Sequence, residues 1–370
     1  MTLIKVNTRG TIVEGGRRSL IHNGAMKVAQ RGSQNNGTGL SGTACDRFRL
    51  AMSGGAAVTT TQDANVPNLS NGFRNSLKVD CTTADTSVAA GDYVILYQRI
   101  EGQDLQHLLY GTTAHKKVTV QFWVKSPKTG THIVELYHLD ATYFNSQQYT
   151  ISSADTWEKK TVTFVGYPTT SFDNDANGSL QLAWWLLGGS TYSGGTHNSN
   201  TWHNTQANRA VGQVNVLDNT ANNFYLTGVQ MEVSDTATEF EHRSFEEELH
   251  ACKRYYQKSF NYDTAPENGG GSGVSFNGGL LGYCGSNNSG TYSGFHRFDP
   301  EMRATPTVVT YGNSSGHWGR LSPTNTGTVS YNAGAGYISN TKASGINFGQ
   351  NAAGDTLLIG FGHITAEAEI

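Results

Sequence analysis

The stretch GVQMEVSDTATEFEHRSFEEELHACKRYYQKSF, from Gly228 to Phe260, passes from an alternating segment through an acidic turn into an amphipathic segment. The alternation of apolar and polar side chains begins slightly earlier and extends from Phe224 to Val233. Strict alternation is the period of a half-buried β-strand, and we expect this strand to close a β-sandwich. The predicted strand would place four side chains on one face: Tyr225, Thr227, Val229 and Met231.

The second half of the stretch predicts a helix over residues 244–260. Ser244, followed three residues later by Glu247, matches a capping box, and the acidic first turn and basic end suit the helix dipole. An apolar stripe at helical spacing would be buried: Phe245, Leu249, Cys252 and Tyr256. Because it is a single helix between two β-rich blocks, we predict that it connects two domains.

The composition is typical of an all-β protein with many turns. The chain of 370 residues contains 44 glycines, and only 15% of its residues are charged, against about 25% in an average globular protein. A net charge of −3 without a basic stripe makes nucleic acid an unexpected partner. No apolar run approaches the roughly 18 residues of a membrane span, so we expect no membrane insertion.

Cysteine spacing excludes a zinc ribbon or a redox motif, because no CxxC pair occurs. We interpret the four cysteines as buried thiols, although spacing leaves disulfides open. The four residues are Cys45, Cys81, Cys252 and Cys284.

Alternating segments separated by Gly, Asn and Ser recur along the chain and predict a β-sandwich of jelly-roll type, followed by one helix and a second, smaller β-sandwich. The expected organisation is an arm (1–44), a jelly roll (45–243), the connecting helix (244–260), a flexible linker (261–273) and a C-terminal β domain (274–370). With the strand ending at Val233, the jelly roll would contain at least seven strands, the others being 76–81, 93–100, 117–125, 131–139, 157–165 and 180–187.

Aromatic side chains mark the first candidate binding site. Trp184 and Trp185 are adjacent in a predicted strand and must face opposite sides of the sheet. A long polar loop follows, and its rings lie among Asn and Gln residues, a combination that suits the C–H faces and hydroxyls of sugars. The predicted glycan-binding residues are Trp185, Tyr192, Trp202 and His203. The alternative is that these rings anchor loops or pack against another subunit.

A second candidate is the loop that contains Asp173, Asp175 and Asn177, which matches the first half of a calcium-binding loop. Trp184 occupies the position of the expected bidentate acid, so a plain turn is the alternative and no other cofactor is predicted. GNSSG (312–316) matches the G-x-S-x-G pattern but lacks a following helix, so we interpret it as a turn. No pair of carboxylates stands out, and we predict no catalytic site.

Four stretches resemble, in the same order, segments of tail fibre and other virion structural proteins of tailed bacteriophages. They are RRSLIHNGAMKVAQRG (17–32), VTVQFWVKSPKTGTHIVELY (118–137), EFEHRSFEEELHACKRYYQK (239–258) and ITAEAEI (364–370). The strand order, which ends on FYLTGVQMEV, is also similar to that of carbohydrate-binding modules, a resemblance of fold alone.

The phage resemblance implies a homotrimeric short tail fibre or spike in the virion, assembled in the cytoplasm of the host bacterium. Its β-sandwich loops would contact host surface polysaccharide, and several copies would multiply weak contacts. In long fibres the RRSL-like signature follows a shaft, whereas here it starts within twenty residues of Met1. We therefore expect direct docking on a tail hub, adaptor or capsid protein through four arginines of residues 1–44: Arg9, Arg17, Arg18 and Arg31.

Two other functions stay open. A head decoration or adaptor protein would bind only other virion proteins, and its aromatic residues would be buried at subunit contacts. A polysaccharide-cleaving tailspike would need two carboxylates about 5–10 Å apart in an open cleft near the aromatic residues.

Overall fold

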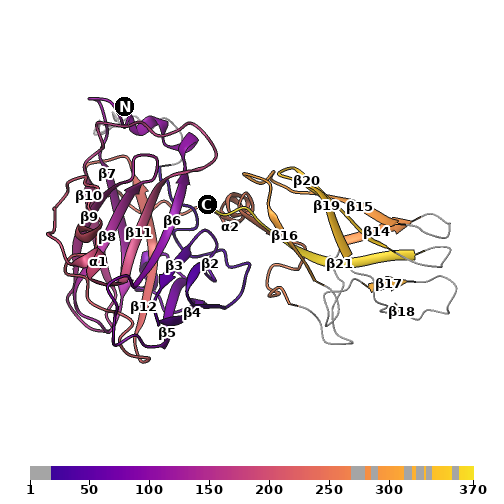
Figure 1. Cartoon of the computed structure of the whole chain (residues 1–370), viewed down its shortest axis with the longest axis horizontal. Helices are drawn as coiled ribbons and strands as arrows, with labels where there is room; N and C mark the ends of the chain where they lie inside the picture. Colours follow the sequence, from indigo (N-terminus) through magenta and orange to yellow (C-terminus); the bar gives the residue numbers. More distant parts are fainter. Residues whose placement is uncertain are drawn as a thin grey trace, which may run out of the picture.

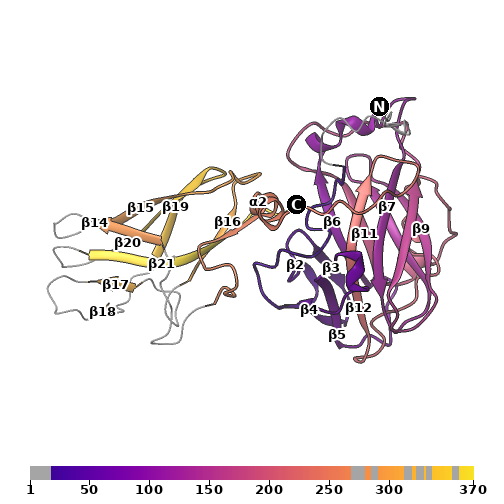
Figure 2. The ribbon, with the colours of Figure 1, turned by 180° about the vertical axis from the view of Figure 1, so that it is seen from behind.

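The computed structural model describes residues 18–267, 280–284, 291–311, 319–321, 329–330, 336–351 and 358–370. Figure 1 shows a large lobe formed by the first part of the chain and a smaller, elongated lobe formed by the last part. The end of the chain returns to the junction of the two lobes, beside the longer helix. The view from behind shows the same division (Figure 2).

The large lobe is a sandwich of two six-stranded antiparallel sheets. The first sheet consists, in spatial order, of β1 (Gln34–Asn36), β4 (Ala57–Asp63), β5 (Ser76–Thr83), β12 (Asn223–Glu232), β7 (Val118–Lys125) and β10 (Glu158–Phe164). The second consists of β2 (Gly39–Gly42), β3 (Arg49–Ser53), β6 (Tyr93–Glu101), β11 (Gly178–Gly188), β8 (Gly130–His138) and β9 (Tyr143–Ile151). The predicted all-β class and jelly-roll sandwich are confirmed.

Short helical turns connect these strands: η1 (Leu69–Asn71), η2 (Gly102–Asp104), η3 (Gln106–Leu108), α1 (Ser190–Ser193) and η4 (Gln206–Asn208). All seven predicted strands are present, with their ends shifted by at most a few residues. The strand that ends the stretch quoted first, β12, lies inside the first sheet between β5 and β7.

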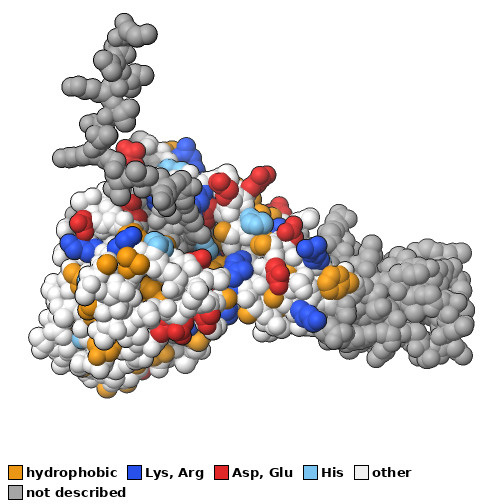
Figure 3. Space-filling view, turned by 90° about the horizontal axis from the view of Figure 1, so that it is seen from above, with side chains coloured by type: hydrophobic (Ala, Val, Ile, Leu, Met, Phe, Trp, Pro, Cys, Tyr) orange, Lys and Arg blue, Asp and Glu red, His pale blue; other side chains and the backbone are white. Residues whose placement is uncertain are grey.

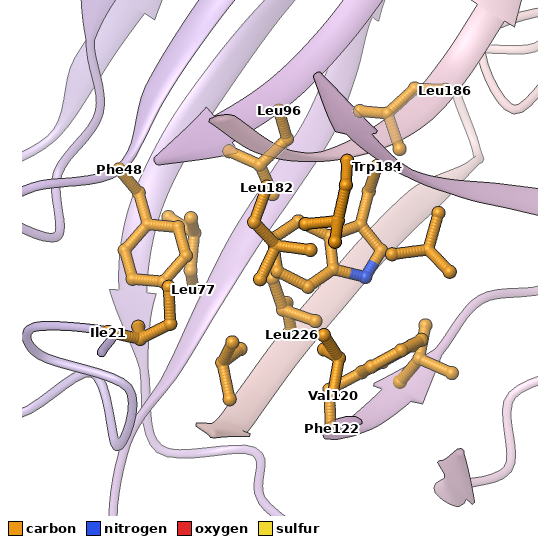
Figure 4. Packing of buried hydrophobic residues seen from close by; sticks show 14 of the residues in the cluster. Ile21, Phe48, Leu77, Leu96, Val120, Phe122, Leu182, Trp184, Leu186 and Leu226 are labelled. Atoms are coloured by element: carbon orange, nitrogen blue, oxygen red, sulfur yellow. The ribbon is translucent and has the colours of Figure 1, made fainter. Parts of the chain in front are cut away.

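The main core lies between the two sheets and consists of alternate side chains from both (Figure 4). Trp184 of β11 is fully buried there and meets Phe122 of β7 edge to face, with ring centroids 5.5 Å apart. Trp185, the next residue, points to the other side of its sheet and belongs to a separate apolar cluster, as the alternation predicted. Three cysteines are buried free thiols: Cys45, Cys81 and Cys252.

Residues 18–44 belong to this sandwich, so the predicted arm is wrong over this range. They supply β1 and β2, and Ile21 and Met26 are buried in the main core. The chain passes so close to β12 that a Cβ on Gly24 would lie 1.9 Å from the carbonyl oxygen of Val229. The reason is backbone pairing, since the amide of Val229 donates to the carbonyl of Gly24.

The helix α2 (Phe245–Lys253) begins with the predicted capping box. Ser244 Oγ accepts a hydrogen bond from the amide of Glu247, whose side chain accepts one from the amide of Ser244. The helix ends earlier than predicted, because the chain continues as the short strand β13 (Tyr256–Lys258). The expected apolar face is also partly wrong: Tyr256 is buried, but Phe245 is 42% exposed, with its ring edge-to-face against Tyr262.

The second lobe is a smaller antiparallel β domain, in which β13 and β16 pair with the long strand β21. In the same sheet β17 and β18 lie on one side of β21, and β14, β15, β20 and β19 lie on the other. No helix in the described ranges is long and apolar enough to cross a membrane. The strands are β14 (Leu280–Cys284), β15 (Thr291–Arg297), β16 (Thr307–Tyr311), β17 (Gly319–Leu321), β18 (Val329–Ser330), β19 (Gly336–Lys342), β20 (Gly345–Asn351) and β21 (Leu358–Glu367). The GNSSG segment lies outside the described residues.

A buried ion network joins the two lobes. Glu369, which follows β21, forms ion pairs with Arg31 and Arg47 of the large lobe. Arg31 also forms an ion pair with Asp46, with 3.3 Å between Nη1 and Oδ1. Although burial opposes it, the two guanidinium groups hold the pKa of the Glu369 carboxyl below its ordinary value. The carboxylate therefore remains charged inside the protein, held by two cations.

A second link lies at the end of α2, where Arg254 and Tyr255 both bind Glu101 of β6. Arg254 donates two hydrogen bonds to this carboxylate, at 2.8 and 2.7 Å, and the hydroxyl of Tyr255 donates a third at 2.6 Å. Figure 3 shows charged side chains of both signs on the described surface around this junction. The segment after β12 thus fastens the second lobe to the first by hydrogen-bonded charges.

Candidate functional site

Trp185 has no exposed surface in this structure. Tyr192 of α1 covers one part of its ring, with centroids 5.3 Å apart, and the guanidinium of Arg209 lies 5.1 Å from the ring centroid. Tyr192 is itself half-buried and meets Tyr93 edge to face. The ring of Trp185 therefore cannot stack on a sugar, because the loop that follows β11 closes over it.

Trp202 and His203, the other predicted glycan-binding residues, anchor the far part of the same loop. Trp202 is half-buried against Tyr167, with ring centroids 5.3 Å apart, and its indole N–H donates to the carbonyl of Val165 at 2.9 Å. His203 exchanges two backbone hydrogen bonds with Phe144 of β9 and is buried. The structure thus brings Trp185 and Tyr192 together but places Trp202 in a different aromatic cluster.

The predicted docking arginines are occupied within the chain where they are described. Arg31 is committed to the buried network, which contradicts its role as an exposed docking residue. Arg18 is partly exposed and donates to Thr238 Oγ1 at 3.1 Å and to the carbonyl of Glu239 at 3.3 Å. Two others lie outside the described residues: Arg9 and Arg17.

The loop predicted as a partial calcium site is held by its own hydrogen bonds. Asp175 accepts hydrogen bonds from the amide of Asn177 at 2.8 Å and from its side chain at 2.6 Å, which is an Asx turn. The amide of Asp173 donates to Asp140 Oδ2 at 3.1 Å. Within the described ranges, no group of three or more His, Cys, Asp or Glu side chains could hold a metal ion. The loop therefore has the features of the plain turn that was the alternative.

A pocket of about 350 Å³ opens on the outer face of the first sheet, away from the main core. Its floor is formed by four residues of neighbouring strands: Gln121 and Trp123 of β7, Lys159 of β10 and Gly228 of β12. Its walls come from the turn at 70–73 and from the segment at 239–242 that follows β12. Its volume falls in the range of small-molecule sites, about 300–1,000 Å³.

A β-bulge at Gly228 shapes the floor of this pocket. Opposite β7, Thr227 pairs with Trp123 and Gln230 with Gln121, so β12 contains one extra residue between these pairs. Because of this insertion, Tyr225 and Thr227 lie on the outer face, whereas Val229 and Met231 are in the core. The prediction that these four side chains share one face is therefore wrong. Bulges of this kind often occur beside functional sites.

Gly228 is expected to tolerate no side chain. Its φ is 62°, and a Cβ would lie 2.7 Å from Phe73 Cζ and 2.9 Å from Trp123 Cδ1. We predict that Gly228→Ala lowers the free energy of unfolding by about 1–3 kcal/mol, measured by urea denaturation. Gly91→Ala is the control, because a Cβ there meets nothing within 4 Å. Equal stability of the two variants would contradict the strain assigned to Gly228.

Three rings form one wall of the pocket and pack against one another. The ring centroids of Phe73 and Phe240 are 5.0 Å apart, and both rings lie within 5.3 Å of the imidazole of His242. Partial removal from water, together with the neighbouring Lys27, holds the pKa of His242 below its ordinary value. At neutral pH this wall is therefore aromatic and uncharged.

The polar group at the floor is the amide of Gln121, which is 1% exposed. Its Nε2 donates to the carbonyl oxygen of Thr238 at 2.8 Å, and this acceptor fixes the orientation of the amide. Its Oε1 is buried with no hydrogen-bond partner among the described residues. A buried acceptor without a donor costs about 1–3 kcal/mol. A ligand that brought a donor would recover this energy.

The pocket thus combines the two kinds of contact that sugar rings require. Trp123 is half-buried and presents an aromatic surface for an apolar C–H face, and Gln121 offers a hydrogen-bond acceptor beside it. Lys159 and Glu239 contribute one positive and one negative charge at exposed positions. This arrangement can bind and orient a small polar ligand.

No protein-family model matches the sequence, and no curated protein matches it. Solved structures with a similar fold include the enzymatically active domain of tailspike protein 4 of bacteriophage CBA120, at 16% identity and a TM-score of 0.30 over 51% of this chain. A family 4 carbohydrate-binding module is similar at 15% identity and a TM-score of 0.30, over 58% of this chain and 99% of that one. A protein of Bacteroides thetaiotaomicron that has been proposed to bind sugar matches at 14% identity and a TM-score of 0.33, over 59% of this chain and 100% of that one. The match covers only 19% of the tailspike chain.

Proposed function

We propose that this chain binds carbohydrate through the pocket over Trp123. The observation that supports the proposal is a half-buried tryptophan beside a buried amide oxygen that lacks a donor, in a pocket of about 350 Å³. A pyranose ring has both complementary features, a C–H face for the indole and hydroxyls for the amide oxygen. The role is one of binding, without catalysis.

The biological setting belongs to the same proposal. The four stretches that resemble tail fibre proteins favour a homotrimeric phage appendage in the virion, docked on a tail hub, adaptor or capsid protein and contacting host surface polysaccharide. Three copies of a weak pocket would together give useful avidity. Analytical sedimentation of the purified protein tests whether it is a trimer. Cryo-electron microscopy of the particle tests whether, and where, it is part of the virion.

Trp123→Ala is expected to abolish most of the sugar affinity while leaving the fold intact. Removing a central aromatic contact typically costs 2 kcal/mol or more, which corresponds to about thirtyfold weaker binding. The measurement is a glycan array followed by titration calorimetry with the best ligand. Trp157→Ala is the matched control, because Trp157 is also half-buried on the outer face of the first sheet but does not line the pocket.

Three outcomes would count against this function. Undiminished glycan binding by the Trp123 variant would place the site elsewhere, with Tyr192 and Trp202 as the next positions to change. An array without any bound glycan would favour the decoration or adaptor function. Release of reducing sugar from host polysaccharide would show that the protein is a polysaccharide-cleaving enzyme.

A further inference from the structure

We infer that the pocket over Trp123 accepts neutral sugars that donate a hydroxyl to Gln121, and that it discriminates against acidic sugars. The inference rests on the proposed function and adds the class of ligand. It follows from three properties of the pocket: the unpaired atom at its floor, the balance of its charges and the apolar character of its wall.

The unpaired atom requires a donor. One N–H of Gln121 Nε2 is donated to Thr238, whereas the acceptor Oε1 has no partner among the described residues, so Oε1 is the atom of this amide that lacks a donor. A hydroxyl can donate to Oε1, whereas an ionised carboxylate has only acceptor oxygens and would face Oε1 with like partial charge. A deoxy or O-methylated sugar would leave the atom unpaired. Sites built around a hydrogen bond to a ligand hydroxyl reject analogues without it strongly.

The charges of the pocket oppose an acidic ligand. Lys159 is one cation, but Glu239 lines the same pocket with one negative charge, and His242 is held in its neutral form. Both charged side chains are exposed to solvent, where a single ion pair is worth little. An acidic sugar would lose hydration on the aromatic wall without gaining a buried cation in return.

The floor and wall favour a ring with an apolar face. Trp123 is adjacent to Gly228, whose missing side chain lets the backbone of β12 approach the indole closely. Phe73 and Phe240 border the same space. A pyranose lying on Trp123 would therefore have its hydroxyls at its edge, and the register between β7 and β12 places Gln121 two residues away on the same strand face.

The test uses the full chain and soluble probes, followed by the shift of tryptophan indole signals in nuclear magnetic resonance spectra. Glucose, galactose and mannose are compared with their uronic acids, with singly deoxygenated derivatives and with O-methyl derivatives. We expect at least one neutral hexose to bind about tenfold or more tightly than its uronic acid, and one deoxy or O-methyl position to lose about tenfold to hundredfold.

Two variants identify the groups responsible. Gln121→Met keeps the size of the side chain but removes the acceptor, and it should bind the parent hexose and its deoxy analogue equally. Trp157→Ala, at a position outside the pocket, should leave the affinity for the neutral hexose within about twofold. The comparison of hexoses in the unaltered protein needs no variant, so it decides the matter even if Gln121→Met fails to fold.

The possible failures are distinct from one another. Tighter binding of uronic acids, or equal binding of all deoxy and O-methyl analogues, would overturn the inference about ligand class while Trp123-dependent binding still supported the proposed function. Loss of the proposed function itself would appear as sugar binding that is unchanged in Trp123→Ala, or as no binding of any sugar.

Discussion

Glu369→Ala is expected to lower the free energy of unfolding by about 3–5 kcal/mol, because it leaves Arg31 and Arg47 buried without their shared carboxylate. Both arginines are buried in the large lobe, and each also lies against a tyrosine of the segment after α2. Guanidinium chloride unfolding measures the loss. The junction of the lobes should also be loosened, although the link at Glu101 remains, and limited proteolysis would detect this as earlier cleavage near the junction.

Glu367→Ala is the matched control. Its carboxylate also faces Arg31, at 3.9 Å, but its side chain is 39% exposed, whereas that of Glu369 is 1% exposed. An exposed pair of this kind contributes about 0–1 kcal/mol. Similar losses in both variants would show that the buried network is not what joins the lobes.

The same carboxylate makes stability depend on pH. Although burial opposes it, Arg47 and Arg31 make the pKa of Glu369 lower in the folded protein than in the unfolded chain. The stabilisation that the carboxylate provides is therefore complete above the ordinary glutamate pKa of about 4.3. It is lost as the pH falls through the lower pKa of the folded protein. Burial raises the pKa of Asp46, which works in the opposite direction. Below about pH 5 the free energy of unfolding should therefore change less with pH in Glu369→Ala than in the unaltered chain.

Arg209→Ala is expected to cost about 3–5 kcal/mol as well, for a different reason. Arg209 donates two hydrogen bonds to the fully buried carboxylate of Glu135, at 3.1 and 2.7 Å, and stacks over Phe144 at 3.9 Å. Its removal leaves the buried carboxylate of Glu135 without a positive partner, with Ser146 as its remaining hydrogen-bond donor, and uncovers Trp185. Urea unfolding measures the loss, and a red shift of tryptophan fluorescence should accompany it.

The double variant Glu135→Leu with Arg209→Met provides the control, because replacing a buried pair by apolar side chains is often neutral. We expect it to recover most of the stability that Arg209→Ala loses. A double variant as unstable as the single one would indicate that the loop between β11 and β12 needs Arg209 for packing alone. Lys128→Ala breaks the more exposed pair with Asp218 and should cost less than about 1 kcal/mol.

Alternation predicted seven strands of the large lobe but missed others, among them β9, whose two faces are both mixed in polarity. YFNSQQYTI, which forms β9, contains few apolar residues, yet Asn145 and Ser146 are buried. Their polar groups are satisfied by distant or neighbouring side chains, as when Ser146 donates to Glu135 at 2.9 Å. Where polar side chains are buried because they form hydrogen bonds to other strands, apolar and polar residues do not alternate, and the sequence shows no strand periodicity.

The pocket could be predicted only in part. In VTVQFWV, alternation puts Gln121 and Trp123 on the face opposite Val120 and Phe122, and in the structure Val120 and Phe122 are the ones in the core. The pattern cannot tell an outward tryptophan that stays accessible from one that a later loop covers. Trp123 stays accessible, whereas Trp185 is covered by Tyr192 and Arg209 of the loop that follows β11.

The ion network at Glu369 also constrains the order in which the protein can mature during synthesis. Arg31 precedes its partner by 338 residues, so at about 5–20 residues per second the ribosome needs roughly 20–70 s to supply the missing carboxylate. During that interval Arg31 and Arg47 of the large lobe lack the carboxylate of Glu369, with which both form ion pairs in the complete protein. Its final packing is therefore a step that follows the translation of β21.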